Sequence, residues 1–158
     1  PGELKALIEY AGQDKRIIIR DIEYSGIELA SLVNLCDCFV SLHRSEGFGR
    51  GPAEAMLLGK PVIATAYSGN MDYMDDSNSC LVDYKLISVK AGEYPGYQNQ
   101  VWADPNVDHA TYWMAKIAED ATLAKRLGER AKLRIEELYA PEVVGPSLDH
   151  HLKRLSGS

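Results

Sequence analysis

The spacing of apolar residues in the first half of the chain alternates between two periods. ELKALIEYAG, residues 3–12, has the spacing of one helix face, whereas RIIIRDI, residues 16–22, is a short β-branched run typical of a buried strand. The same pattern then predicts helices over 25–36, 51–60 and 69–76 and strands over 37–43, 61–65 and 79–84. Ser25 is suited to cap the first of these helices, and Pro52 is suited to the first turn of the second.

The second half of the chain has a different pattern. Residues 85–107 show little periodicity and contain Gly, Pro and several aromatic residues, which predicts an ordered surface loop. C-terminal helices are expected over 108–156, in the stretches 108–120, 121–139 and 141–155. Asp108 or Thr111 is the expected N-cap of the first, and Pro141 is suited to open the last.

Strands that alternate with helices across short connections favour a parallel sheet with helices on both faces. The fold class predicted is therefore α/β. With 158 residues the chain fits one domain, 1–158, and is long enough to bury a substantial core. Ligands of such sheets bind beyond the carboxyl ends of the strands, where loops run into helices.

Charge and cysteine content narrow the functional classes. The net charge of −6 argues against nucleic acid as the main partner, because there is no basic excess to neutralise a phosphate backbone. Three cysteines, an odd number without a disulfide framework, indicate reduced thiols and a cytosolic setting. Cys36 and Cys38 form a C-x-C pair without further ligands at matching spacing, so buried structural cysteines are favoured over a metal site.

The length of the apolar runs and the residues at the two ends of the chain bear on membrane insertion and on the length of the native protein. No apolar run reaches the ~18–20 residues that span a bilayer. The chain starts without Met, shows no signal peptide and ends in SGS, so we expect the native protein to be longer.

The stretch SEGFGRGPAE, residues 45–54, places two carboxylates around a glycine-rich turn that opens a helix. Free amides at a helix N-terminus form an anion site, and the glycines let the backbone come close to a ligand. Two carboxylates repel a lone phosphate but accept hydrogen bonds from hydroxyls. A nucleotide sugar, with its diphosphate between two hydroxyl-bearing rings, satisfies both facts. The alternative is an ordinary α/β turn in which Glu54 only complements the helix dipole.

The segment SEGFGRGPAEAMLLGKPVIATAYSGNMDYM resembles the E-x7-E signature of retaining GT-B glycosyltransferases, family four, also called group 1. The preceding RIIIRDIEYSGIELASLVNLCDCFVSLH is similar to the family's strand, turn, helix and strand that lead into the signature. The resemblance covers about residues 15–84. It implies a Rossmann-like parallel sheet flanked by helices, the C-terminal half of a GT-B enzyme, with 1–158 as the donor-binding domain.

The resemblance also implies roles for individual residues. Glu46 would hold the transferred sugar at the reacting centre and is the catalytic candidate. Glu54 would bind the ribose hydroxyls. The donor-binding set also comprises Gly47, Phe48, Gly49, Arg50 and Gly51 in the loop. Ile22, Glu23 and Tyr24 would hold the nucleotide base, and His43 lies beside the signature. For Arg50 a solvated surface role and for His43 a structural role remain open. No metal and no cofactor is implied.

The sequence departs from the family pattern in ways that bear on activity. The Arg and Lys that usually neutralise the diphosphate are not present, and Arg44 and Arg50 are the nearest cations. Asp72 stands where a Glu is usual. We expect the acceptor domain and the first strand of this domain to lie upstream of residue 1, so that the chain alone transfers little or no sugar.

The resemblance implies a parent enzyme that moves a hexose from a nucleoside diphosphate sugar to a glycan or lipid-linked acceptor, as in polysaccharide biosynthesis. Its expected location is the cytoplasm, at most peripherally bound to the inner face of a membrane. Two alternatives stay open: a non-catalytic nucleotide-sugar-binding module, and another GT-B enzyme such as a sugar-nucleotide epimerase or a phosphorylase. The residues expected at the site of an epimerase or of a phosphorylase are not recognisable in this sequence.

Overall fold

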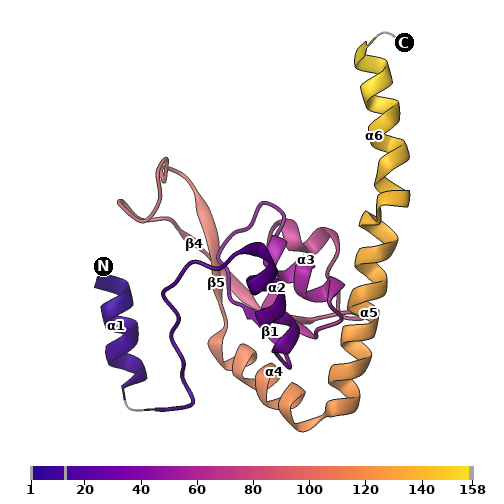
Figure 1. The fold of residues 1–158 in the computed structure, drawn as a ribbon. Coiled ribbons are helices and arrows are strands. Elements are labelled where there is room, and N and C mark those ends of the chain that lie inside the picture. Colours follow the sequence, from indigo (N-terminus) through magenta and orange to yellow (C-terminus); the bar gives the residue numbers. More distant parts are fainter. Residues whose placement is uncertain (1, 13, 157–158) are drawn as a thin grey trace.

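The computed structural model describes residues 2–12 and 14–156. In chain order, its elements are α1 Gly2–Ala11, α2 Gly26–Leu35, β1 Phe39–Ser41, α3 Arg50–Leu57, β2 Val62–Thr65, the 3-10 turn η1 Gly69–Asp72, β3 Cys80–Val82, β4 Tyr84–Ser88, β5 Val101–Pro105, α4 Val107–Glu119, α5 Ala121–Tyr139 and α6 Pro141–Ser156. Figure 1 shows the sheet and its covering helices in the middle, with α1 and α6 projecting from opposite sides.

A parallel sheet in the order β1-β2-β3 forms the centre of the fold. Phe39 pairs with Val62, and Ile63 with Cys80, in a register without a slip. The central strand β2 is buried along its whole length. A strand covered on both faces reads as a continuous apolar run, which is why PVIAT was identifiable as a strand. The predicted α/β class with a parallel sheet flanked by helices is confirmed.

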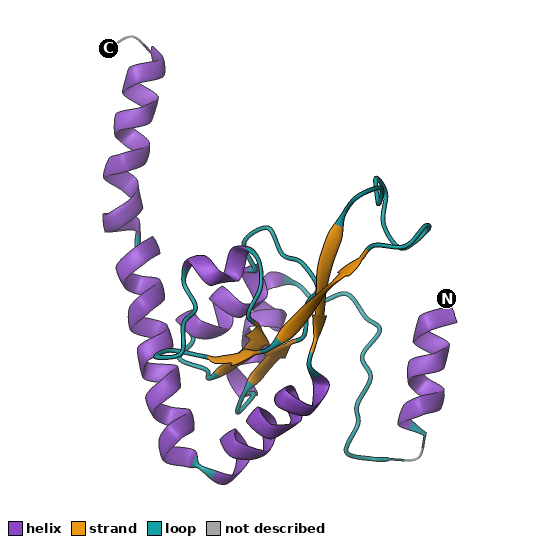
Figure 2. Ribbon diagram, turned by 180° about the vertical axis from the view of Figure 1, so that it is seen from behind, coloured by secondary structure: helices purple, strands orange, loops and turns teal. Residues whose placement is uncertain are grey.

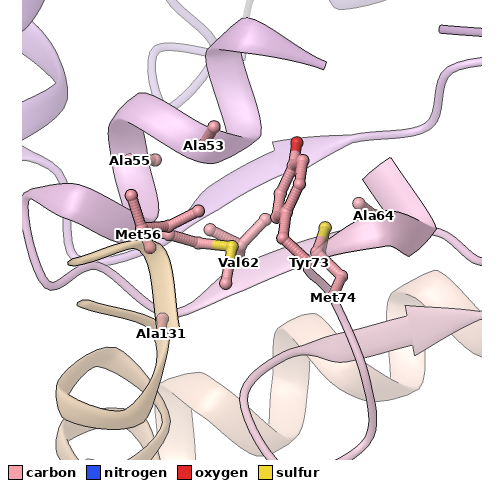
Figure 3. Close-up of a cluster of buried hydrophobic side chains, with 9 residues drawn as sticks. Ala53, Ala55, Met56, Val62, Ala64, Tyr73, Met74 and Ala131 are labelled. Carbon is pink, nitrogen blue, oxygen red and sulfur yellow. The ribbon is translucent and has the colours of Figure 1, made fainter. Parts of the chain in front are cut away.

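Each face of the sheet carries its own core. On one face Met56 of α3, Val62 of β2, Ala131 of α5 and Tyr73, which is 1% exposed, belong to one buried cluster (Figure 3). On the other face Ile63 packs with buried residues of β3, α4 and α5. Because Val62 and Ile63 are adjacent in β2, they point to opposite faces and divide the two cores. These cores hold the loops at the carboxyl ends of β1 and β2.

The strand predicted at 16–22 is wrong. In the structure this β-branched segment is an extended linker between α1 and α2 without a ladder partner, and Ile18 is 71% exposed. A strand needs a neighbour to satisfy its backbone groups, and β1 pairs only with β2 among the described residues. High β-propensity therefore does not produce a strand in this segment.

The loop predicted over 85–107 holds the two strands of a β-hairpin, β4 and β5, and residues 89–100 between them are the loop. β4 and β5 pair antiparallel, with Leu86 opposite Ala103 and Ile87 opposite Trp102. The hairpin rises from the body of the domain, and its tip is drawn as loop in Figure 2. Gly and Pro at the tip dilute the alternation that would have identified the strands.

The helix bounds agree with the pattern more closely. Ser25 caps α2 in a capping box with Glu28, as expected from the sequence. The cap of α4 was predicted incorrectly, because Asn106 rather than Asp108 or Thr111 accepts the hydrogen bond, from the His109 amide. Among the described residues, no helix is long and apolar enough to cross a membrane.

Candidate functional site

The signature loop, residues 46–51, connects β1 to α3 at the carboxyl end of the sheet. Helix α3 begins at Arg50, one to two residues earlier than predicted, and its N-cap Gly49 has a left-handed backbone with φ 82°. This conformation favours glycine. Because the helix starts at Arg50, Glu54 lies in its second turn, where a carboxylate complements the helix dipole less than in the first turn. At this position the Glu54 carboxylate is less a dipole partner than a side chain available to a ligand.

Five consecutive backbone amides in the signature loop are free. Among the described residues, none of the amides from Gly47 to Gly51 donates a hydrogen bond. The next residue, Pro52, has no amide proton, and the Ala53 amide donates to the Gly49 carbonyl at 3.1 Å. The run of free amides therefore ends at Gly51. A run of free amides at a helix N-terminus is a binding site for an anion.

The loop after β2 holds the signature loop from one side. The Glu46 amide donates to Ser68 Oγ at 2.8 Å, and the Gly69 amide donates to the Glu46 carbonyl at 3.0 Å. The backbones approach so closely that a Cβ on Gly69 would collide with the Gly47 carbonyl. Ser68 has φ 73° and ψ −149°, at the edge of a region that is essentially restricted to glycine. Local strain is thus stored beside Glu46.

Aromatic rings hold the other side of the signature loop. The buried Tyr73 hydroxyl donates to the Gly49 carbonyl at 2.6 Å. Burial raises the pKa of Tyr73, so the hydroxyl stays protonated and remains a donor. The Phe48 ring lies 5.2 Å from the Tyr73 ring and 5.3 Å from that of Tyr139 on α5. These contacts fix the loop to the core and leave Phe48 39% exposed.

His43 connects the end of β1 to the loop after β2. Its Nε2 lies 3.0 Å from the Tyr67 carbonyl and 3.1 Å from Asn70 Oδ1, both acceptors, so Nε2 carries the proton. Nδ1 lies 3.3 Å from Ser41 Oγ. Asn70 is itself buried and donates to the Thr65 carbonyl at 3.0 Å, which fixes its orientation. Both ring nitrogens of His43 have protein partners, which favours the structural role.

The charged groups of the site are arranged as two pairs and one carboxylate. Arg50 donates to Glu54 Oε1 at 2.9 Å, with side chains 85% and 50% exposed. Arg44 lies 3.5 Å from Asp104 of β5 and its guanidinium stands 4.9 Å from the centre of the Trp102 ring. Glu46 is half-buried and borders a cavity of about 560 Å³ between the signature loop and the hairpin. The two nearest cations are therefore already paired.

The segment predicted to hold the base is not joined to the signature loop. Ile22 is 60% exposed, Glu23 is exposed and Tyr24 is half-buried, all in the linker that precedes α2. In the described part of the chain, no hydrogen bond or ion pair connects these three residues to residues 46–51. The structure thus places the signature loop against the loop after β2, which His43 contacts through Tyr67 and Asn70, and leaves the contacts to the nucleotide base a prediction.

Sequence reasoning missed three features of the site: the strained Ser68, the Tyr73 hydroxyl and the hairpin wall. No local pattern marks a serine with positive φ, and a Tyr in a short helical stretch reads as core. The cysteines lie away from the loop. Burial raises the pKa of Cys38 to about 11 and that of Cys80 to about 12. Among the described residues, no cluster of three or more His, Cys, Asp or Glu side chains could hold a metal ion.

Solved structures similar to this chain show its fold. Anabaena Alr3699/HepE, whose structure was determined in complex with UDP and glucose, is 20% identical with a TM-score of 0.73, covering 97% of this chain and 36% of that chain. The C-terminal domain of the group 1 glycosyl transferase LpcC from Francisella tularensis is 24% identical with a TM-score of 0.64, covering 87% and 61%.

Relatives in sequence identify the family. The human alpha-1,3/1,6-mannosyltransferase ALG2 is 22% identical over 153 residues, which are 97% of this chain and 32% of that protein. The chain thus spans about a third of the length of the relatives matched first. The family glycosyl transferases group 1 matches residues 3–134, most of the chain. The chain therefore belongs to the group 1 glycosyl transferases, and its fold is that of the C-terminal domain of a GT-B enzyme.

Proposed function

We propose that this domain binds the nucleoside diphosphate sugar donor of a retaining glycosyltransferase that transfers a hexose to a glycan or lipid-linked acceptor. The observation that carries the proposal is the run of five free amides from Gly47 to Gly51 between two glutamates. The UDP and glucose held by the Anabaena relative support a nucleotide-sugar ligand for this chain as well.

The diphosphate occupies the N-terminus of α3 in this proposal. Its oxygens accept hydrogen bonds from the loop amides, and the helix dipole adds about 0.3–1 kcal/mol of further stabilisation. Arg44 and Arg50 are held by Asp104 and Glu54. In this conformation the loop amides are therefore the unpaired donors of the anion site, and Arg50 becomes a further donor once a ligand displaces it from Glu54.

The two glutamates bind the two sugar rings. Glu46 borders the cavity at the sugar end and accepts hydrogen bonds from hydroxyls of the transferred hexose. Glu54 is half exposed one turn into α3 and accepts them from the ribose. Its exposed pair with Arg50 is worth at most about 1 kcal/mol, so a ribose hydroxyl can displace the guanidinium at little cost.

Retention follows from a front-face displacement in which donor and acceptor react on the same side of the sugar. The enzyme then contributes position and stabilisation of the departing diphosphate, without metal, and the free amides supply the stabilisation where negative charge develops. An acceptor domain outside these 158 residues completes the cleft, so we expect little or no transfer by this chain alone.

Calorimetry with UDP, GDP, dTDP and ADP, each free and as a sugar conjugate, tests the proposal. We expect the nucleotides of one base to bind more tightly than the others, with or without Mg²⁺. Glu54→Ala should weaken that affinity about 10- to 100-fold, because a hydrogen bond to a charged group is worth about 1.5–3 kcal/mol.

The control is Glu129→Ala, which removes an exposed carboxylate 3.9 Å from Lys125 one turn away on α5 and should leave affinity unchanged. An equal affinity of wild type and Glu54→Ala would overturn the ribose assignment. No binding by any nucleotide would overturn donor binding by this chain.

A further inference from the structure

The β4–β5 hairpin forms one wall of the cavity that Glu46 borders. The opposite wall is Arg44–Gly47, and the hairpin contributes Tyr94, Gln100 and Trp102. The volume of the cavity, about 560 Å³, lies within the ~300–1,000 Å³ that is typical of small-molecule sites. The hairpin therefore borders a ligand-sized cavity beside the first residues of the signature loop.

The hairpin is held to the site by its strand β5. The Ala103 amide donates to the Arg44 carbonyl at 2.9 Å, and Ala103 is completely buried. The Arg44 side chain pairs with Asp104 and lies over the Trp102 ring. On the other strand, Tyr84 contacts the Tyr67 ring at 5.0 Å. These contacts fix the base of the hairpin beside Arg44, two residues before Glu46.

The hairpin tip is also ordered by its own bonds. The Val89 amide donates to the Gln100 carbonyl at 3.0 Å, and the Gln100 amide donates to the Tyr97 carbonyl at 3.0 Å. Val89 is buried under this turn. The tip thus presents Tyr94, which is 63% exposed, from a defined backbone. An ordered wall loses little conformational entropy when a ligand binds.

The chemistry of the cavity matches a sugar ring. A hexose has an apolar face of C–H groups and a rim of hydroxyls. Tyr94 supplies an exposed aromatic face, and Glu46, Gln100 and the Arg44 guanidinium supply polar groups around it. The Trp102 ring completes this wall beneath the Arg44 guanidinium. Apolar surface with a few convergent polar groups is the usual composition of a ligand site.

We propose that the hairpin and Arg44–Gly47 together form a hexopyranose subsite, with Tyr94 as the stacking platform and Gln100 as a hydroxyl-binding residue. The inference rests on the proposed function in placing the subsite next to the donor. The ring belongs either to the donor or to the acceptor sugar that the donor approaches. The subsite thereby contributes to the choice of sugar, which the signature loop alone does not make.

Saturation-transfer NMR with the methyl glycosides of glucose, mannose and galactose tests the subsite without any nucleotide. We expect transfer to at least one glycoside from wild type, and at least a fivefold loss in Tyr94→Ala and in Gln100→Ala. Tyr97→Ala is the matched control, because Tyr97 lies on the same hairpin and borders a different cavity. No transfer, or equal transfer by Tyr94→Ala and Tyr97→Ala, would overturn the subsite. This result is independent of whether nucleotides bind.

The source of the ring is decided by two further measurements. If it is the donor sugar, Tyr94→Ala weakens binding of the sugar conjugate at least fivefold and leaves the free nucleoside diphosphate unaffected. If it is the acceptor sugar, both affinities stay unchanged, and the same substitution in the full-length enzyme raises KM for the acceptor at least fivefold without lowering kcat in proportion. A variant that changes neither would overturn a role of the subsite in transfer.

Discussion

Substitutions of Ser68 test whether the backbone beside Glu46 is strained. With φ 73° and ψ −149°, Ser68 has a conformation whose cost for a non-glycine residue is about 1–3 kcal/mol. Its Oγ accepts a hydrogen bond from the half-buried Glu46 amide at 2.8 Å. Ser68→Ala and Ser68→Gly both remove this bond, but only glycine also removes the strain.

The comparison of the two variants isolates the strain. Losing the bond destabilises both by about 1–3 kcal/mol, because the Glu46 amide loses its acceptor. Glycine then regains the ~1–3 kcal/mol of strain and loses about 0.5–1 kcal/mol to the greater freedom of the unfolded chain. Ser68→Gly should therefore be more stable than Ser68→Ala, by up to about 2.5 kcal/mol.

Equilibrium urea unfolding of the two variants measures this difference directly. Ser88 on β4 provides the control, because its φ is not positive and glycine there should be less stable than alanine by about 0.5–1 kcal/mol. If Ser68→Gly were also less stable than Ser68→Ala, Ser68 would carry no strain and the reasoning would be refuted.

Four further predictions concern the core and the thiols. Tyr73→Phe removes the donor to the Gly49 carbonyl and should lower the unfolding free energy by about 1 kcal/mol, since that carbonyl keeps a second donor from α3; an unchanged urea midpoint would contradict this. Gly128→Ala places a Cβ against a backbone carbonyl in the turn after α3, and overpacking should destabilise by about 1–3 kcal/mol although alanine favours helices; a gain in stability would disprove the contact. Cys38 and Cys80 have raised pKa values, so both should react slowly with iodoacetamide at pH 8 in the native state by mass spectrometry, Cys80 more slowly because it is buried; rapid labelling of Cys80 would contradict its burial. In the folded state both thiols lose their protons at a higher pH than in the unfolded chain. The free energy of unfolding should therefore keep its full thiol contribution below about pH 9 and decrease as the pH rises towards 11–12. An unfolding free energy that does not change over this pH range would contradict the sign.

The sequence pattern predicted the fold where elements carry their own signal. The run 61–65 reads as a buried strand because both of its faces are covered, and 25–36 reads as a helix because Ser25 and Glu28 cap it locally. The strand expected at 16–22 depends on a neighbour that no local pattern reports. The hairpin was hidden because glycine, proline and polar residues at its tip interrupt the alternation of its strands.

The candidate site was predictable only in part. The spacing of Glu46 and Glu54 around a glycine-rich turn identified the loop and its helix. This spacing does not show that the helix starts at Arg50, because the Arg50–Glu54 ion pair forms only when the first helical turn has formed. The contact of Ser68 with Glu46 joins residues 22 positions apart and follows from the packing of two loops. Such long-range backbone contacts leave no period in the sequence.

The most direct test of the central claim is a titration of the ¹⁵N-labelled chain with UDP, GDP, dTDP and ADP, followed by amide chemical shifts. The claim is that the free amides from Gly47 to Gly51 hold a diphosphate. We expect the largest shifts at these five amides with the preferred nucleotide, and much smaller shifts with the corresponding nucleoside, which lacks phosphate. Binding with unperturbed amides at 47–51, or shifts as large with the nucleoside alone, would contradict the account.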